Sequence, residues 1–212
     1  PMNKDSRLIG FSSVLTNTIG LVVKKLTLFW FRRDLRLDDN AGLFYALKDH
    51  DAVLPVFIFD TDILQKLEDK DDARVNFIHE TVATLKESLQ QRGSDLLVRH
   101  GKPLEIFKEL FSQFAIEAIY TNHDNEPYAR TRDEKVAKLA QAHQAEFKDF
   151  KDQSLFDRDE ILTDSKKPYT VYTPYKNKVL KTLNKFYLKS YPNDLYESSY
   201  AKVSKKIRKD HS

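Results

Sequence analysis

Apolar residues follow two alternating patterns along the chain. Short, nearly continuous apolar runs lie at 26–31, 52–60, 95–100, 118–121 and, more weakly, 146–150. Runs of this length that are rich in β-branched and aromatic residues predict buried strands. Between them, spacings of three or four predict helices over 41–48, 71–92, 103–114 and 128–144. Strands that alternate with helices in this way predict an α/β fold, an open five-stranded parallel sheet with helices on both faces.

Local signals support several of these boundaries. Asn40, like the two aspartates before it, is a suitable cap for a helix that begins at Ala41. Gly93 suits the end of the long second helix, and Pro103 suits the first turn of the third. Pro55 interrupts the second apolar run, so we expect it near the start of that strand, where a missing N–H costs least.

The two ends of the chain do not follow this pattern. We interpret residues 1–25 as a leader or upstream extension that is poorly ordered, because polar residues break its apolar stretch and no signal-peptide cleavage site follows. Residues 26–151 form the predicted α/β domain, and residues 152–212 begin as a polar connection. A further helix is expected over about 174–188, and the residues beyond Ser190 are expected to form a frayed end.

Composition and charge exclude some classes of protein. The chain has no cysteine, hence no disulfide and no thiolate metal site, which fits a reducing cytoplasmic location. No apolar run reaches the roughly 18 residues of a membrane span. The net charge of +3 combines −6 over residues 1–165 with +9 over residues 166–212. A basic tail is compatible with nucleic-acid binding, although a solvated or packed linker explains it better.

The polar loop after the first predicted strand is not a glycine-rich phosphate-binding loop. Residues 30–40 read Trp-Phe-Arg-Arg-Asp-Leu-Arg-Leu-Asp-Asp-Asn. This stretch resembles the N-terminal motif of the DNA photolyase/cryptochrome family, Trp-Phe-Arg-x-Asp-Leu-Arg-Leu-x-Asp-Asn. Three further segments resemble family motifs in the same order: 122–133, with its Glu-Pro-Tyr loop, 155–162, and 167–177, with Lys-Pro-Tyr-Thr-Val-Tyr-Thr-Pro-Tyr.

The resemblance implies the N-terminal, Rossmann-like antenna domain of a deoxyribodipyrimidine photolyase. In that family a helical domain follows, binds FAD and receives UV-damaged DNA, and light-excited reduced FAD splits cyclobutane pyrimidine dimers. The antenna of the first domain is often methenyltetrahydrofolate or a deazaflavin. By this resemblance, residues 152–212 are the interdomain connection and the start of the helical domain. The present chain would then carry no catalytic residue and be inactive alone.

Within the α/β domain the resemblance places Glu126 where folate-using members have a carboxylate that hydrogen-bonds the pterin ring. A carboxylate suits this role because it accepts two parallel N–H bonds. The alternative is an ordinary carboxylate at a helix start. Asn122 and Asn125 are weaker candidates for antenna binding. Trp30 at the end of the first strand is a candidate wall of a planar-ligand pocket, although a core position is the more common role for such a residue.

Other conspicuous residues have simpler explanations. We expect Arg32, Arg33 and Arg36 to form local ion pairs with the aspartates between and after them, rather than phosphate contacts. The tyrosines at 169, 172 and 175 have a spacing of three and are expected to dock against the helical domain. The six histidines show no metal-ligand spacing, so no metal site is assigned.

Two alternatives remain beside light-driven repair. One is a cryptochrome-type blue-light photoreceptor with the same fold and flavin, although the Glu-Pro-Tyr and Thr-Pro-Tyr segments look more like bacterial photolyases. The other is a stand-alone nucleotide-binding module. No membrane partner is expected. If the helical domain is absent, its docking face is exposed, and weak self-association through that face is expected.

Overall fold

The computed structural model describes residues 25–67, 72–157 and 159–203. The expected leader over 1–25 therefore lies outside the described residues, apart from Lys25. Within the described ranges, no helix has the length and apolar character needed to cross a membrane.

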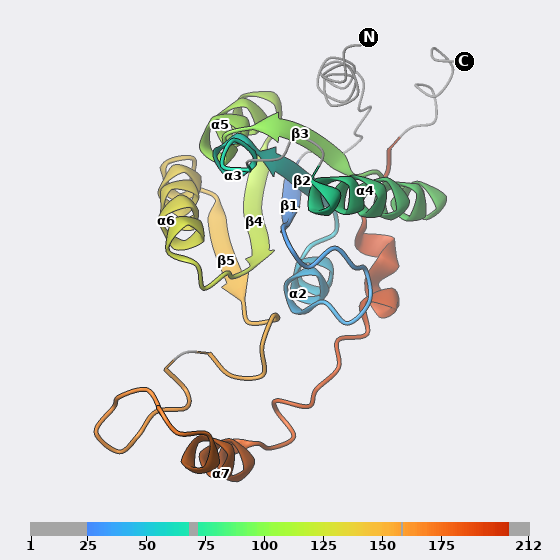
Figure 1. The fold of residues 1–212 in the computed structure, drawn as a ribbon. Coiled ribbons are helices and arrows are strands. Elements are labelled where there is room, and N and C mark those ends of the chain that lie inside the picture. The colour runs from blue at the N-terminus through green and yellow to red at the C-terminus, as the bar shows by residue number, and fades with distance from the viewer. Residues whose placement is uncertain (1–24, 68–71, 158, 204–212) are drawn as a thin grey trace.

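Five parallel strands form one sheet at the centre of the molecule (Figure 1). They are β1 (Leu26–Phe31), β2 (Val53–Asp60), β3 (Leu97–Gly101), β4 (Ile116–Asn122) and β5 (Glu146–Phe150). The spatial order is β3-β2-β1-β4-β5. The chain therefore runs outward from β1 to β3 and then crosses to the other side of β1, which makes the β1/β4 boundary the topological switch point. The predicted five-stranded parallel sheet is confirmed.

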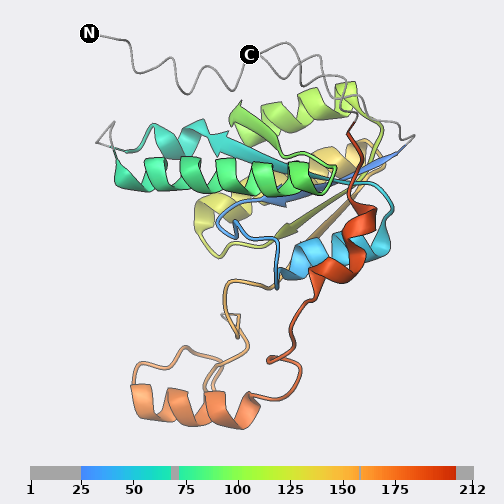
Figure 2. The same cartoon turned by 90° about the vertical axis from the view of Figure 1, so that its right-hand side faces the viewer.

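Helices cover both faces of the sheet (Figures 1 and 2). The helices are α2 (Ala41–Asp49), α3 (Thr61–Leu64), α4 (Ala73–Gln91), α5 (Pro103–Gln113), α6 (Pro127–Ala142), α7 (Tyr172–Thr182) and the 3₁₀ helix η1 (Asn193–Ser199). Trp30 packs in one core with Phe107 of α5 and Val136 of α6. Phe29 packs in the other core with Leu43 of α2 and other residues of α2 and α4. Successive residues of β1 thus serve opposite cores, as strand geometry requires.

Pro55 is the third residue of β2 and lies opposite Phe29 of β1. The ladder between β2 and β3 begins only at Val56. The missing N–H of Pro55 therefore precedes the β3 ladder, and the proline is accommodated near the start of a buried strand as expected.

The C-terminal part of the chain differs from two expectations. The helix expected over 174–188 is shorter and begins earlier: α7 starts at Tyr172 and ends at Thr182. In the turn beyond it, the side chain of Asn184 accepts a hydrogen bond from the N–H of Phe186. The expectation of a frayed end beyond Ser190 is wrong through residue 203. Tyr200 is 2% exposed and bridges to Val53, and Ala201 N–H donates to Val53 O at 2.8 Å.

The returning segment therefore packs on the α/β domain. η1 lies beside α2 (Figure 1), and buried Asn193 donates from Nδ2 to Asn40 O at 3.2 Å. Between β5 and η1 the chain makes an excursion that carries α7 away from the sheet (Figure 2). None of the residues of α7 is buried.

Candidate functional site

The carboxyl ends of β1 and β4 are joined by a buried amide. Asn122, at the end of β4, is 3% exposed. Its Nδ2 donates to Asp34 Oδ2 at 2.5 Å and to Asn40 Oδ1 at 2.8 Å, and its Oδ1 accepts from Gly42 N–H at 2.8 Å. These bonds use both amide groups of Asn122 and fix the loop after β1 and the start of α2. The structure thus places Asn122 in an internal network beneath the site.

Ion pairs of the loop after β1 reach distant segments. Arg32 pairs with Asp133 of α6 and also donates to Asn122 O. Arg33 pairs with Asp124 and Glu126 of the loop after β4, and Arg36 with Asp152 after β5. The expectation of ion pairs among the loop's own charges is therefore wrong, because tertiary contacts supply the partners. Burial lowers the pKa of Arg32, and its Nε has no hydrogen-bond partner in the described structure.

A largely apolar cavity of about 190 Å³ opens at this edge of the sheet. Its floor is formed by the ends of β1 and β2, and its sides by α3, α4 and the first turns of α6. The apolar lining is Trp30, Phe57, Ile58, Phe59, Ile63, Leu64, Val75, Ile78 and Ala129. The polar lining is Arg32, Arg33, Asp60, Asp124, Glu126, Tyr128 and Arg132. We call this the Trp30 cavity.

Trp30 forms an unusual wall of this cavity. Its side chain is 1% exposed, and the guanidinium carbons of Arg32 and Arg132 lie 5.2 and 4.7 Å from its ring centroid. Phe107 meets it edge-on at 5.0 Å. Cation–π attraction to the indole adds to the ion pairs that both guanidinium groups form with Asp133. Trp30 is therefore both a core residue and a lining residue, so its two expected roles are compatible.

Glu126 lies at the rim of the Trp30 cavity, at the N-terminal boundary of α6. Its carboxylate is 59% exposed and accepts from Arg33 Nη2 at 2.5 Å, which leaves it accessible to a ligand. Deeper in the cavity, Tyr128 donates its hydroxyl to Asp60 Oδ2 at 2.8 Å. Burial, and then this hydrogen bond, raise the pKa of Tyr128, so the phenol stays protonated and donates at neutral pH.

Residues 27–194 of the chain match the family model for DNA photolyase. The chain belongs to the DNA photolyase family. Over 148 residues it is 40% identical to a deoxyribodipyrimidine photo-lyase of Synechococcus, covering 70% of this chain and 30% of that protein. The carboxyl-edge cavity is therefore a feature of a photolyase-family domain.

Solved structures of the family share this fold. An archaeal photolyase from Sulfolobus tokodaii with two FAD molecules is 33% identical, with a TM-score of 0.60, over 74% of this chain and 35% of that one. A Synechocystis cryptochrome is 25% identical, with a TM-score of 0.66, over 75% of this chain and 34% of that one. The chain thus spans about a third of the length of these relatives and matches their N-terminal domain.

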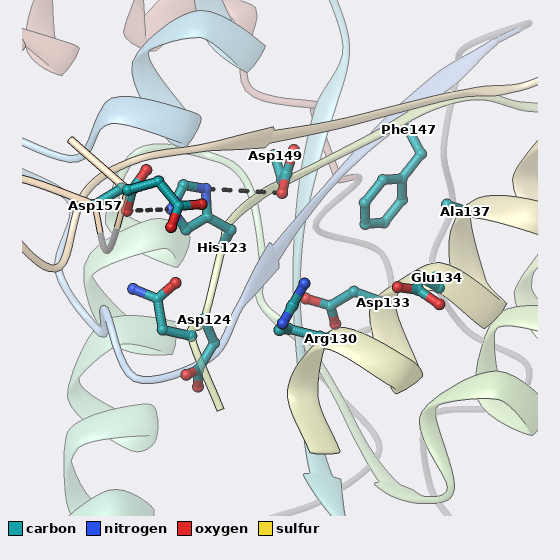
Figure 3. A pocket seen from close by; sticks show the side chains of 11 residues that line it. His123, Asp124, Arg130, Asp133, Glu134, Ala137, Phe147, Asp149 and Asp157 are labelled. Atoms are coloured by element: carbon teal, nitrogen blue, oxygen red, sulfur yellow. Dashed lines mark hydrogen bonds and ion pairs between the residues drawn. The ribbon is translucent and has the colours of Figure 1, made fainter. Parts of the chain in front are cut away.

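Asn125 of this photolyase-family domain lines a different, more polar cavity of about 320 Å³ between the loop after β4, α6 and β5 (Figure 3). In this cavity His123 Nε2 lies 3.0 Å from Asp157 Oδ1, and His123 Nδ1 lies 3.7 Å from Asp149 Oδ2. The predicted site residues therefore separate. Glu126 and Trp30 line one cavity, Asn125 lines another, and Asn122 supports the loops. In the described parts of the chain, no group of three or more histidine, aspartate or glutamate side chains is arranged to hold a metal ion.

Sequence reasoning missed several residues of the Trp30 cavity. Arg132 and Tyr128 lie within the Glu-Pro-Tyr segment that carries the family resemblance, and Asp60 ends a predicted strand. The rule that parallel sheets bind ligands at their carboxyl ends was the available signal for Asp60. Ile63 carried no such signal, because it lies in the short helix α3, which was not predicted. Ile78 carried none either, because it belongs to the ordinary amphipathic pattern of α4.

Proposed function

We propose that this domain binds the flat ring of a light-harvesting chromophore in the Trp30 cavity. The observation that carries the proposal is a largely apolar cavity at the carboxyl edge of the sheet, with Trp30 as a wall. Of its few charged groups, Glu126 is exposed at the rim, whereas Asp60, Arg32 and Arg132 are largely buried. Ligand sites combine apolar walls with a few polar groups that set orientation. At about 190 Å³ the cavity accommodates a ring system, while the remainder of the ligand stays outside.

Polar groups of the lining define the ligand's polar edge. The exposed carboxylate of Glu126 accepts N–H bonds, as an aminopyrimidine edge of a pterin requires. Arg32 and Arg132, which are buried and paired with Asp133, are N–H donors that suit carbonyl oxygens. These preferences support methenyltetrahydrofolate, a deazaflavin or a flavin as the antenna. The Sulfolobus tokodaii photolyase holds two FAD molecules, with the implication of a novel light-harvesting cofactor in that protein, which supports a flavin-like antenna in this family.

For the whole protein we propose photolyase activity. Reduced FAD in the helical domain, once light-excited, supplies the electron that splits a pyrimidine dimer. The present chain's part is to hold and orient an antenna and to dock the helical domain, and the chain alone is inactive. The lack of cysteine supports a reducing, cytoplasmic location. A cryptochrome-type photoreceptor is the second candidate, favoured by the likeness to the Synechocystis cryptochrome.

The excursion that carries α7 is the proposed docking element for the helical domain. Val171 and Tyr172 are 61% and 72% exposed, and Leu180 is 62% exposed. Apolar exposure on this scale marks a surface that another body covers. In the isolated chain this surface supports weak self-association. Sedimentation velocity at increasing concentration tests this directly, and a constant monomeric coefficient at the highest concentration contradicts it.

The antenna proposal is tested by titrating the chain with methenyltetrahydrofolate, a deazaflavin and riboflavin. We expect saturable one-to-one binding of at least one of them. Glu126→Gln weakens a pterin by about tenfold, because a charged acceptor becomes neutral, while Asn125→Ala, in the other cavity, leaves affinity unchanged. Ala129→Phe, which fills the cavity, abolishes binding in a protein whose circular dichroism is unaltered. If Glu126→Gln, Asn125→Ala and Ala129→Phe all bind the chromophore with the affinity of the wild type, the proposal is overturned.

The repair proposal is tested separately with the full-length parent protein. We expect loss of pyrimidine dimers from irradiated DNA only under blue or near-ultraviolet light. If the flavin-loaded parent protein does not repair dimers but changes conformation under light, the result supports the photoreceptor function instead. Neither outcome alters the result for chromophore binding by the present chain.

A further inference from the structure

A second cavity, of about 490 Å³, is lined in part by Arg36 and Asp39 of the loop after β1. The rest of its lining comes from the residues that follow β5, from the first turns of α2 and from the returning segment at 186–191. Its lining shares no residue with that of the Trp30 cavity. It is within the size range of small-molecule sites and lies at the carboxyl edge of the sheet.

The walls of this second cavity are aromatic and flat. Tyr45 of α2 stacks on Phe150 at 4.8 Å with an interplanar angle of 13°. Tyr191 and Tyr187, which also line the cavity, come from the returning segment. Phe150 in turn stacks on Tyr120 at 5.6 Å, so Tyr45 is the outer ring of this stack. An outer ring of this kind provides a surface on which a planar heteroaromatic ring stacks, and such stacking tolerates many ring types.

The cations of the cavity differ in how far they are neutralised. Arg36 is held by Asp152, and Lys151 is held by Glu160 at 2.7 Å. Lys189 has no carboxylate within 4 Å among the described residues. Its ammonium lies 3.1 Å from Tyr45 Oη and 4.9 Å from the ring centroid of Tyr191.

Lys189 is therefore a cation positioned by aromatic groups and available to an anion. The hydrogen bond with Tyr45 raises the pKa of Lys189, so the ammonium stays charged at neutral pH. The N-terminus of α2 is not available in the same way, because Ala41 N–H already donates to Asp152 Oδ1 at 3.0 Å. Among the cations that line the cavity, Lys189 is thus the one that lacks a carboxylate partner in the described part of the chain.

We propose that this cavity binds a mononucleotide, with the base stacked on Tyr45 and the phosphate on Lys189. A lysine ammonium is a compact point charge that suits a phosphate. The ring alone lacks the ionic contact, and phosphate alone lacks the stacking surface, so affinity requires both parts of the ligand. The site is independent of the antenna proposal, because the two cavities have separate linings.

Adenosine monophosphate is the probe for this site, titrated into the full 212-residue chain and followed by calorimetry and by tyrosine and lysine NMR shifts. We expect saturable binding with shifts at Tyr45, Tyr191 and Lys189. Adenosine and inorganic phosphate each bind at least about tenfold more weakly, as expected for loss of one charge-assisted contact or of the stacking. Trp30 fluorescence stays unchanged during the titration.

Matched lysine variants separate a specific site from general electrostatics. Lys189→Gln weakens the nucleotide by at least about tenfold, Lys189→Arg retains most of the affinity, and Lys185→Gln, at an exposed lysine that lines none of the cavities described above, has no effect. If Lys185→Gln weakens binding as much as Lys189→Gln, or if no saturable binding occurs, the proposal is overturned. Ala129→Phe leaves nucleotide affinity unchanged, so failure here is distinguishable from failure of the antenna proposal.

Discussion

Arg36, in the loop after β1, forms an ion pair with Asp152, in the connection after β5. Arg36 Nη2 lies 2.9 and 2.8 Å from the two carboxylate oxygens of Asp152. The Asp152 side chain is 4% exposed, although that of Arg36 is 45% exposed. Because Ala41 N–H also donates to Asp152, one carboxylate joins the loop after β1, the start of α2 and the connection that leaves β5.

Replacement of Asp152 tests this junction. Asp152→Asn keeps an acceptor for Ala41 N–H but removes the charge that binds Arg36 and complements the α2 dipole. We expect the free energy of unfolding to fall by about 1–2 kcal/mol, the scale of a lost hydrogen bond to a charged group. Urea unfolding measures the change, with exposed Asp164→Asn as the control that stays within about 0.5 kcal/mol. Identical midpoints for Asp152→Asn and the wild type contradict this role.

Gly42 is required by the close approach of α2 to β4. A Cβ at this position meets Asn122 Oδ1 at 2.7 Å and Thr121 O at 3.0 Å. Gly42→Ala therefore displaces the buried amide that links the loops, and we expect a loss of about 1–3 kcal/mol. Denaturant unfolding of this variant and of exposed Lys48→Ala on the same helix checks the expectation. A stabilised Gly42→Ala, as helix propensity alone predicts, contradicts it.

Buried tyrosines make stability fall at high pH. Burial raises the pKa of Tyr128 and of Tyr200 above their ordinary value. An unfolded tyrosine loses its proton near about pH 10, whereas these two keep theirs when folded. The unfolded state therefore binds fewer protons, and stability is constant below about pH 10 and falls as pH rises through the folded values.

Phenolate absorbance and urea unfolding test this pH dependence together. In the folded chain we expect a delayed fraction of the phenolate absorbance, and Tyr128→Phe and Tyr200→Phe each reduce that fraction. Tyr200→Phe also flattens the loss of stability above about pH 10. Tyr172→Phe, at an exposed tyrosine, is the control for the substitution itself in the urea experiment. Single-phase titration of all tyrosines in the folded protein is the contrary result.

The elements that sequence predicts well are those with local causes. Apolar runs gave four of the five strands, a weaker pattern gave β5, and the spacing of apolar residues gave α2, α4, α5 and α6 within a few residues. Asn40 caps α2 as expected, since its side chain accepts from Leu43 N–H. In each case the signal lies within one turn or one strand, where the chemistry of the neighbours in sequence decides the structure.

The features that sequence does not predict depend on distant partners. Arg33 has nearby aspartates in sequence, yet it pairs with Asp124 and Glu126 because the loop after β4 lies opposite it in the fold. Tyr200 belongs to no periodic apolar face, and it is buried because the returning segment bridges to Val53 and brings the side chain into the core that contains Phe29. The Trp30 cavity draws residues from five elements, so its shape exists only after the sheet and both helix layers are assembled.

Energy transfer from Trp30 is the most direct test of the antenna site, because Trp30 is the chain's one tryptophan and lines the proposed cavity. The measurement is Trp30 emission during titration with the chromophore that binds most tightly, together with the excitation spectrum of the bound chromophore. The account predicts saturable quenching of Trp30 at one equivalent and a tryptophan band in that excitation spectrum. Stoichiometric binding that leaves Trp30 emission unchanged, or no binding of any of the three chromophores, contradicts it.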